Sequence, residues 1–438
     1  MNTPVHPLVR YAWYGDDFTG STDVLDALGR AGVSSVLFLR RPQPQQLTPF
    51  FPCTAIGLAG ESRSRNPEWM DAHLPGAFEF LRSLQPQVCH YKVCSTFDSA
   101  PHIGSIGRAL EIGQDLFGTP VVPIVGFAPH LGRYLLFGNL FAATHGEVYR
   151  IDRHPVMSCH PVTPMHEADL RLHLARQTTR PIALAELIAL RSLEPGQLLS
   201  KIKATKNAAV LFDGFDETDL LRTGRVLSAL AENEPVFAVG SSGLTYALLA
   251  RWRECGFIGA ASETPRAAEV DRILVLSGSC SPVTNRQIQH AEAIGFAIVE
   301  MNPPRLVSET ASALAQARSA AVTALRSGRS VLICTARGPQ DPLPTGLVQH
   351  LPLHLGRLLA DLVQETRVRR IVIAGGDTSS HAVQQLNIFA LTWLAPLSPG
   401  APLCRAHSAD PALDGLELTL KGGQAGSEDF FEKTRRGV

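Results

Sequence analysis

Two aspartates stand side by side in the segment Gly15-Asp16-Asp17-Phe18-Thr19-Gly20. The apolar residues 9–13 before it predict a buried strand, and residues 21–31 after it predict a helix. Ligands of open α/β sheets bind beyond the carboxyl ends of the strands, and helix N-termini favour anions. Adjacent carboxylates repel unless a cation or a proton donor joins them. We therefore interpret Asp16, Asp17 and Thr19 as site residues; the alternative is a turn in which Asp17 or Ser21 caps the helix.

A second polar segment, residues 92–99, follows the predicted strand at residues 88–94 and combines one lysine, several hydroxyls and one carboxylate. Lys92 could bind the carboxylate of a sugar acid, while Ser95, Thr96 and Asp98 could bind its alcohols. The alternative is a polar turn that caps the next helix. Because a lysine on an apolar strand needs a counter-charge, we favour the site.

The loop after the predicted strand at residues 121–125 offers two further contacts to a substrate, His130 and Arg133. Four histidines between residues 154 and 173 recur at intervals of six and seven, unlike the i, i+4 pair of a helical metal site. We interpret these four as structural or surface residues, and the sequence leaves any metal ligands unknown.

Three segments of the second half place small residues and hydroxyls where a strand gives way to a helix or a turn. They contain Ser277 and Ser279, then Gly376, Asp377, Thr378 and Ser379, then Gly422 and Gly423. Exposed backbone N–H groups and short side chains let phosphates approach closely there. Neither the P-loop pattern nor the dinucleotide-binding pattern occurs in the chain.

Short apolar runs alternate with helical patterns along most of the chain, which predicts an α/β fold with mainly parallel sheets. Among the predicted strands are residues 33–39, 121–125, 297–300 and 331–334, and among the predicted helices are residues 165–177, 306–326 and 380–386. A chain of 438 residues exceeds one ordinary core. Residues 259–271 lose the apolar periodicity, so we expect a substrate-binding domain at 1–260 and a nucleotide-binding domain at 270–438, facing a central cleft.

The composition narrows the range of partners. Forty basic and forty acidic residues cancel, so we expect a small-molecule partner rather than nucleic acid or an anionic membrane. No apolar run is long enough for a membrane helix, and the eight scattered cysteines read as reduced thiols, which together predict a cytoplasmic protein. The sequence leaves open whether the chain forms a homo-oligomer.

Four motifs in this order resemble those of the four-carbon acid sugar kinase family: GDDFTG, SGSCSPVTNRQ, AGGDTS and LKGGQAGSEDFF. The resemblance implies ATP-dependent phosphorylation of a terminal hydroxyl of threonate, erythronate, a 3-oxo-tetronate or a close relative. It also implies ATP contacts at the eight second-half residues named above, and sugar-acid contacts at the Asp-Asp and Lys92 segments.

The segment after Lys92 departs from the family pattern Asp-Ser-Thr-Leu-Arg-Gly-Asn. Cys94 replaces the Asp and Asp98 replaces the Arg, so the usual sugar-acid contacts do not transfer intact. This departure makes a branched or oxo acid such as 3-oxo-isoapionate a candidate substrate.

Phosphoryl transfer needs a base for the hydroxyl proton and charge neutralisation around the phosphates. We expect Asp17 or Asp98 to be that base, with Lys92 binding the substrate carboxylate and Mg²⁺ arriving with ATP. Two alternatives remain: a sensor that binds sugar acid and nucleotide without transfer, and an aldolase or dehydratase that holds a metal on Asp16 and Asp17.

Overall fold

The computed structural model describes residues 9–144, 146–205, 208–259, 265–302, 309–338 and 345–438, with the backbone alone at 345–352 and 377–379. Contacts divide the chain into two compact units. The first unit comprises Met1–Ser35 and Gln43–Ser262, and the second comprises Val36–Pro42 and Glu263–Val438. The chain therefore passes from one unit to the other three times.

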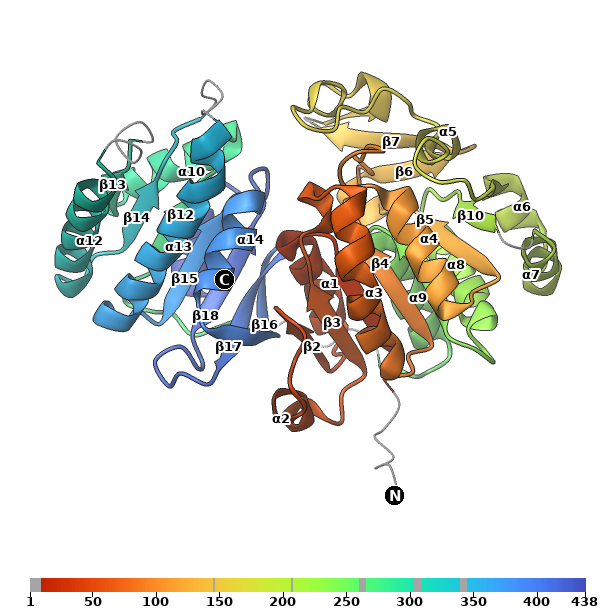
Figure 1. Cartoon of the computed structure of the whole chain (residues 1–438), viewed down its shortest axis with the longest axis horizontal. Coiled ribbons are helices and arrows are strands. Elements are labelled where there is room, and N and C mark those ends of the chain that lie inside the picture. Colours follow the sequence, from red (N-terminus) through yellow and green to blue (C-terminus); the bar gives the residue numbers. More distant parts are fainter. Residues whose placement is uncertain (1–8, 145, 206–207, 260–264, 303–308, 339–344) are drawn as a thin grey trace. The chain divides into compact units, whose positions relative to one another are not determined.

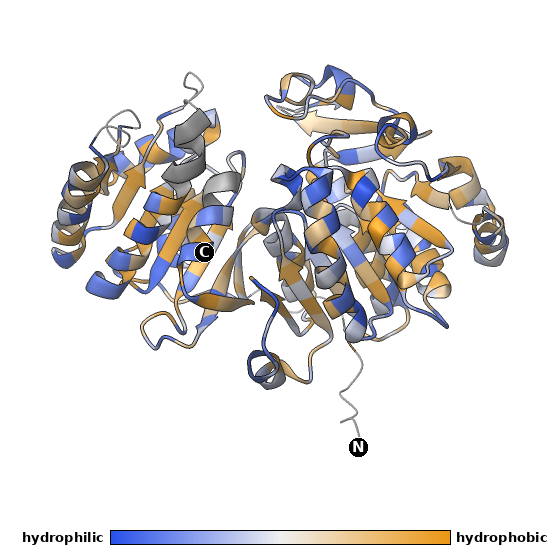
Figure 2. Ribbon diagram, in the orientation of Figure 1, coloured by the Kyte–Doolittle hydropathy of each residue, from blue (hydrophilic) through white to orange (hydrophobic). Residues whose placement is uncertain are grey.

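The first unit contains a parallel sheet of seven strands in the order β3-β1-β4-β11-β5-β10-β9. The strands are β1 (Tyr11–Gly15), β3 (Ala55–Ala59), β4 (Val88–Lys92), β5 (Val121–Val125), β9 (Ile182–Ala185), β10 (Ala208–Phe212) and β11 (Val236–Gly240). Every residue of β1, β3, β4, β5, β10 and β11 is buried, as expected for parallel strands covered on both faces. Figure 2 shows that the helices beside these strands carry both hydrophilic and hydrophobic residues.

Helices and short 3₁₀ turns connect these strands (Figure 1). The longer helices are α1 (Phe18–Arg30), α3 (Pro67–Ser83), α4 (Ile106–Phe117), α8 (Glu217–Leu230) and α9 (Ser242–Glu254); the shorter ones are α2 (Pro44–Leu47), α5 (Leu170–Leu174), α6 (Leu187–Ser192) and α7 (Pro195–Lys203). Helix α3 packs against α4, and α8 packs against α9. The 3₁₀ turns are η1 (Thr48–Phe50), η2 (Ser62–Ser64), η3 (Pro129–Leu131), η4 (Ile151–Arg153) and η5 (Met157–Cys159).

A small antiparallel sheet lies between β5 and α5 in the sequence. Its strands are β6 (Arg133–Leu136), β7 (Asn139–Thr144) and β8 (Glu147–Arg150). The buried Asp213 carboxylate accepts hydrogen bonds from the backbone N–H groups of Phe137 and Gly138, at 2.7 and 2.9 Å. These bonds tie the turn between β6 and β7 to the residue that follows β10.

The second unit contains five parallel strands, in the order β13-β14-β12-β15-β18, extended by β17 and β16. The strands are β12 (Leu274–Ser277), β13 (Ala297–Glu300), β14 (Val331–Cys334), β15 (Arg370–Ala374), β16 (Ile388–Ser398), β17 (Ala401–Ser408) and β18 (Glu417–Lys421). Strands β16 and β17 form an antiparallel hairpin, and β2 (Ser35–Phe38) pairs antiparallel with β16 through Leu37 and Phe38.

The helices of the second unit are α10 (Pro282–Ala293), α12 (Thr310–Arg326), α13 (Thr345–Thr366), α14 (Gly376–Gln385) and α15 (Phe430–Arg436). One cluster of its core joins Val275 of β12, Leu332 of β14 and Val372 of β15 to Ile288 of α10 and Phe431 of α15. Burying such side chains contributes about 1.5–3 kcal/mol each relative to exposure.

The α/β fold with mainly parallel sheets is confirmed. Strands β5, β13 and β14 have the bounds that the sequence predicts, whereas the helix predicted at residues 165–177 is wrong for most of its length, because α5 spans only Leu170–Leu174. Helix α14 begins at Gly376, four residues before its predicted start. Residues 306–308 of the helix predicted at 306–326, and 260–264 of the predicted linker, lie outside the described residues.

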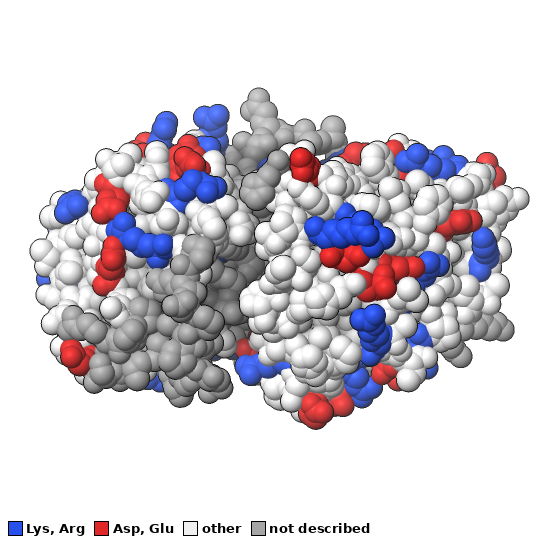
Figure 3. All heavy atoms as spheres, turned by 90° about the horizontal axis from the view of Figure 1, so that it is seen from above, with Lys and Arg blue, Asp and Glu red and all other residues white. Residues whose placement is uncertain are grey.

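The surface carries both signs of charge. On the face drawn in Figure 3, basic and acidic side chains lie beside one another, in keeping with the balanced composition. Among the described helices, none combines the length and the apolarity that crossing a membrane requires.

Candidate active site

Three adjacent strands of the first unit deliver their following loops to the same edge of the sheet. Gly15 ends β1 and lies in register with Ala59 of β3 and with Lys92 of β4. The loops are tied together directly, since Asp16 N–H donates to the Lys92 carbonyl (2.9 Å) and Arg63 N–H donates to the Asp16 carbonyl (3.1 Å). The Asp-Asp and Lys92 segments therefore meet, and the loop after β3 joins them.

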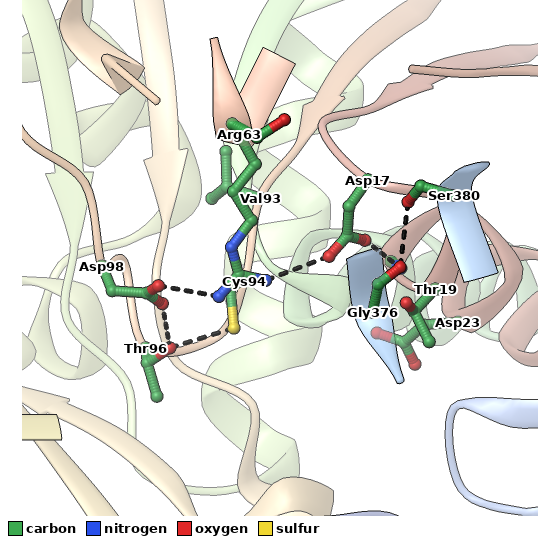
Figure 4. Close-up of polar contacts among 12 residues, drawn as sticks. Asp17, Thr19, Asp23, Arg63, Val93, Cys94, Thr96, Asp98, Gly376 and Ser380 are labelled. Atoms are coloured by element: carbon green, nitrogen blue, oxygen red, sulfur yellow. Dashed lines mark hydrogen bonds and ion pairs between the residues drawn. The ribbon is translucent and has the colours of Figure 1, made fainter. Parts of the chain in front are cut away.

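Arg63, in the 3₁₀ turn η2, bridges two of the predicted site carboxylates (Figure 4). Its Nη1 lies 3.0 Å from Oδ2 of Asp17, and its Nη2 lies 2.7 Å from Oδ2 of Asp98. The Asp98 side chain is fully buried, whereas 32% of the Arg63 side chain is exposed. A guanidinium is thus present beside Asp98, but it comes from a different segment than the family pattern suggests.

Asp98 accepts hydrogen bonds at both carboxylate oxygens. Thr96 Oγ1 donates to Oδ1 at 2.5 Å, and Thr163 Oγ1 donates to Oδ2 at 3.3 Å, beside the Arg63 contact. Burial works against the charge of Asp98, but the Arg63 guanidinium and the Thr96 hydrogen bond hold its pKa below the usual value. Asp98 is therefore a stably ionised carboxylate with few free lone pairs.

Asp17 has two roles in the structure. It is the N-cap of α1, since one of its oxygens accepts a hydrogen bond from Gly20 N–H, and its other oxygen pairs with Arg63. Ser21 Oγ donates to the Asp17 carbonyl at 2.6 Å. Asp17 therefore caps helix α1 with one oxygen and pairs with Arg63 through the other, so the two interpretations of Asp17 are compatible.

Asp16 differs from both of the other carboxylates. It is only 5% exposed, its Oδ1 is buried, and neither of its oxygens accepts a hydrogen bond from a residue that the structure describes. Burial, with the neighbouring Asp17 charge added, raises the pKa of Asp16 to about 7. The site thus contains one carboxyl group that exchanges its proton near neutral pH.

Lys92 has the counter-charge that a lysine on a buried strand requires. Its Nζ lies 3.4 Å from Oδ2 of Asp23 on α1 and donates to the Val93 carbonyl at 3.0 Å. Burial disfavours its charge, yet Asp23 and Asp16 raise the pKa of Lys92 above the usual value. A Cβ on Gly20 would lie 3.2 Å from this Nζ and 3.7 Å from Oδ1 of Asp16, so the backbone of α1 approaches the charges closely.

Three smaller polar groups complete this part of the site. Thr19 Oγ1 is buried and without a partner among the described residues, while Ser95 is half-buried. Cys94 Sγ lies 2.9 Å from Thr96 Oγ1, so the sulfur of Cys94 contacts the hydroxyl that holds Asp98 (Figure 4).

The loop after β5 contributes Arg133 and His130. Arg133 Nη1 donates to the carbonyls of Leu131 (2.6 Å) and Ala143 (3.2 Å), and its Nε is buried without a partner. In the described part of the chain no carboxylate forms an ion pair with Arg133. His130 is exposed, and its ring lies against the ring of Tyr246 at a tilt of 41°, with 3.9 Å between the ring centroids.

In the second unit, the three predicted nucleotide segments follow the neighbouring parallel strands β12, β15 and β18. Gly278 N–H donates to the Ala374 carbonyl (3.0 Å), and Gly375 N–H donates to the Lys421 carbonyl (2.8 Å). A Cβ on Gly423 would lie 2.9 Å from Oγ of Ser279, so the first and third segments also touch. The three segments therefore lie together at one edge of this sheet.

The middle segment begins helix α14. Gly375 has a φ of 114°, a conformation that L side chains rarely adopt, and Gly376 is the first helical residue. Gly376 has open space where a Cβ would be, and Ser380 Oγ donates to its carbonyl at 3.1 Å. The predicted contacts Asp377, Thr378 and Ser379 have side chains outside the described residues.

Ser277 Oγ is buried and has no described partner, whereas Ser279 Oγ accepts a hydrogen bond from Ser281 N–H at 3.2 Å. The free N–H groups of the first turn of α14 and these short side chains suit phosphate oxygens. Among the described residues, no three His, Cys, Asp or Glu side chains gather in a way that would hold a metal ion.

Three site residues were absent from the sequence prediction: Arg63, Asp23 and Thr163. Arg63 had an available signal, because Glu61-Ser62-Arg63-Ser64-Arg65 follows an apolar strand just as the predicted segments do. Thr163 had none, since it lies in a proline-rich stretch; its Oγ1 is 3.1 Å from Nδ1 of His160, which therefore also lies close to Asp98.

Comparison with known proteins places both units in described families. Residues 11–248 match the family described as sugar-binding N-terminal domain, and residues 274–431 match the family described as nucleotide-binding C-terminal domain. The chain is 45% identical to the 3-oxo-isoapionate kinase of Paraburkholderia graminis, over 97% of this chain and 94% of that one. It is 29% identical to the 3-oxo-tetronate kinase of Methylobacterium radiotolerans, over 95% and 96% of the two chains.

Solved structures share the fold. A Haemophilus influenzae protein has a TM-score of 0.72 at 24% identity, with 97% of this chain and 99% of that chain covered. The fold and the two sets of loops define an α/β protein with a sugar-binding part and a nucleotide-binding part. The chain belongs to the four-carbon acid sugar kinase family, and it is a sugar-acid kinase.

Proposed function

We propose that this chain transfers the γ-phosphoryl group of ATP to a hydroxyl of a small sugar acid, and that 3-oxo-isoapionate or a close analogue is its substrate. The observation that carries this proposal is the 45% identity, over 97% of the chain, to a 3-oxo-isoapionate kinase. The departure at Cys94 and Asp98 from the wider family pattern also favours an acceptor other than an unbranched four-carbon acid.

We infer that Asp16 is the base that receives the hydroxyl proton. Asp98 has donors on both oxygens, and Asp17 is held by its capping bond and by Arg63, whereas Asp16 has no hydrogen bond to a described residue. A pKa near 7 also suits a base at neutral pH, since a weaker base would capture the proton poorly. The earlier expectation of Asp17 or Asp98 stays a prediction to be compared with this one.

In this mechanism the hydroxyl oxygen attacks the γ-phosphorus as its proton passes to Asp16, and the bond to the bridging oxygen breaks to release ADP. Arg63 fixes Asp17 and Asp98 and reduces the repulsion around Asp16. Lys92 balances Asp23 and Asp16. The protein therefore contributes mainly orientation and charge, as phosphoryl transfer requires.

The rate should depend on pH around neutrality. Because Asp16 accepts a proton only as the carboxylate, and its pKa is about 7, kcat/KM for the sugar acid at saturating ATP should be level above pH 7 and fall about tenfold per unit below it. Initial rates between pH 5 and 9 would test this. An acidic limb centred below pH 5 would contradict the role of Asp16.

The substrate carboxylate has a better partner in Arg133 than in Lys92. Lys92 already lies beside Asp23, whereas Arg133 forms no ion pair with a described carboxylate and its Nε is buried and unused. Leaving a buried guanidinium N–H unsatisfied is costly, and a planar carboxylate suits its geometry. We infer that Arg133 binds the carboxylate of the sugar acid.

Replacing Arg133 with Met should raise KM for the sugar acid by about 10–100-fold, the loss of one charge-assisted pair, with KM for ATP unchanged. Arg133→Lys should restore part of the affinity. The control is a substrate analogue with an amide in place of the carboxylate, which should bind the wild type and Arg133→Met equally. If Lys92→Met raises KM and Arg133→Met does not, Lys92 is the anchor.

The nucleotide fits the second unit. Serine and glycine loops after β12 and β18, with the N-terminus of α14 between them, offer backbone N–H groups and hydroxyls to phosphates. Mg²⁺ is expected to arrive with ATP, because this ion is held largely by substrate phosphates and by only one or two carboxylates.

The activity is tested by ADP formation with ATP and a panel of 3-oxo-isoapionate, 3-oxo-tetronate, threonate and erythronate. The expected result is substrate-dependent ADP release, with the highest kcat/KM for 3-oxo-isoapionate. Binding of the acids without ADP release would identify a sensor, and turnover without ATP would identify an aldolase or dehydratase. The cytoplasmic location stays a prediction.

A further inference from the structure

The glycine loop after β18, residues 422–427, turns its backbone carbonyls toward helix α10. Gln287 of α10 donates from Nε2 to three of them, those of Ala425 (3.0 Å), Gly426 (3.1 Å) and Ser427 (2.9 Å). Thr284, one turn earlier on the same helix face, donates from Oγ1 to the Gly423 carbonyl at 2.9 Å. Both Thr284 and Gln287 are fully buried.

Lys421, the residue just before the loop, contacts the same loop and helix α10. Its Nζ donates to Thr284 Oγ1 (3.1 Å) and to the carbonyls of Gly422 (2.9 Å) and Gly423 (3.4 Å). The side chain is fully buried, and no described carboxylate balances its charge. Burial lowers the pKa of Lys421 to about 7. A cation that the fold leaves without a counter-charge calls for an anion from outside the chain.

The direction of the carbonyls determines the direction of the N–H groups. In a trans peptide the N–H points opposite to the C=O of the same unit, so carbonyls held toward α10 turn the following N–H groups away from it. The N–H groups of Gly423, Gln424 and Gly426 donate to no acceptor among the described residues. Successive free N–H groups of this kind form a concave binding place for anions.

We propose that Thr284, Gln287 and Lys421 are positioning residues that aim the N–H groups of the loop at the phosphates of the nucleotide. This inference rests on the proposed kinase function. Thr284 and Gln287 act through the loop without touching the nucleotide, while Lys421 adds a positive charge beneath it. Ser279, which lies against Gly423, would then border the same phosphates.

The test compares Thr284→Val, Gln287→Met and Lys421→Met with the wild type in the full chain. Each variant keeps the size of the side chain and removes its donor. Loss of loop orientation should raise KM for ATP about tenfold or more and shrink the ATP-dependent rise in Tm, while KM for the sugar acid changes by less than about twofold. Thr284→Ser keeps the hydroxyl and should restore ATP binding.

The outcomes separate this inference from the function on which it rests. If Thr284→Val and Gln287→Met bind ATP as the wild type does, or raise both KM values equally, the positioning role is refuted and the kinase function stands. If the wild type shows neither an ATP-dependent rise in Tm nor ADP formation, the kinase function itself fails. The three variants remove different donors, so one that does not fold leaves two that decide.

Discussion

Replacing Asp16 with Asn is expected to lower kcat by about 10²–10⁴-fold, the usual contribution of a positioned base, with little change in KM for either substrate. The amide keeps the size of the side chain and cannot accept the proton. Initial rates at saturating ATP and sugar acid, measured at pH 8, test this directly. The acidic limb of the pH profile should disappear with the carboxylate.

The matched controls are Asp17→Asn and Asp98→Asn. Both carboxylates already accept hydrogen bonds, so their variants should change KM for the sugar acid or the stability more than kcat. If either variant lowers kcat more than Asp16→Asn does, the residue replaced in that variant, and not Asp16, is the catalytic base.

Stability separates a catalytic effect of Asp16 from unfolding. The native pKa of Asp16, about 7, lies above the value of about 3.9 expected in the unfolded chain. The proton on Asp16 therefore stabilises the fold at low pH, and that contribution is lost as the pH rises through 7. At pH 8 the Asn variant should melt at the same temperature as the wild type or higher, so a loss of activity there reports on chemistry.

Replacing Arg63 with Met is expected to lower kcat/KM for the sugar acid by about 10²–10³-fold, which corresponds to about 3–4 kcal/mol of transition-state stabilisation. The variant removes the cation that joins Asp17 to Asp98 and leaves the carboxylates near Asp16 to repel one another. Steady-state kinetics with the sugar acid varied would measure the effect, and KM for ATP should stay near its wild-type value.

The variant should also lower Tm. Removing one partner of a fully buried ion pair costs about 3–5 kcal/mol, and the cost here is smaller because 32% of the Arg63 side chain is exposed. Arg65→Met is the control, since Arg65 lies two residues away and pairs with Glu61 in a partly exposed contact, of a kind worth about 0–1 kcal/mol at a protein surface. Equal kinetics for Arg63→Met and Arg65→Met would rule out the role of Arg63.

Much of the fold follows from local patterns. The strands at residues 121–125, 297–300 and 331–334 are short and mostly apolar runs, and their bounds are as predicted. Such runs depend on neighbours only a few residues away. The motifs after β1, β4, β12, β15 and β18 are likewise visible in the sequence, because each directly follows an apolar run. Their role as candidate sites follows from the rule that ligands bind beyond the carboxyl ends of parallel strands.

The hairpin of β16 and β17 was not predicted from the sequence. Strand β16 contains Pro396, and its pairing with β17 has several register shifts, so the alternation expected of an antiparallel strand is broken. The apolar pattern of residues 33–39 predicts a strand but does not indicate its partner. In the structure β2 pairs with β16, about 350 residues further along the chain.

The candidate site likewise depends partly on local sequence and partly on contacts between distant segments. Asp16, Asp17, Lys92 and Asp98 are identifiable from residue type and from the strands they follow. The protonation state and the ion-pair partner of each of these groups depend on residues of other segments. Arg63 pairs with Asp98, Thr163 donates a hydrogen bond to Asp98, and Asp23 pairs with Lys92. Charge–charge interactions and desolvation depend on distances in space. The sequence alone therefore identifies these four residues of the site, whereas the tertiary structure determines their protonation states.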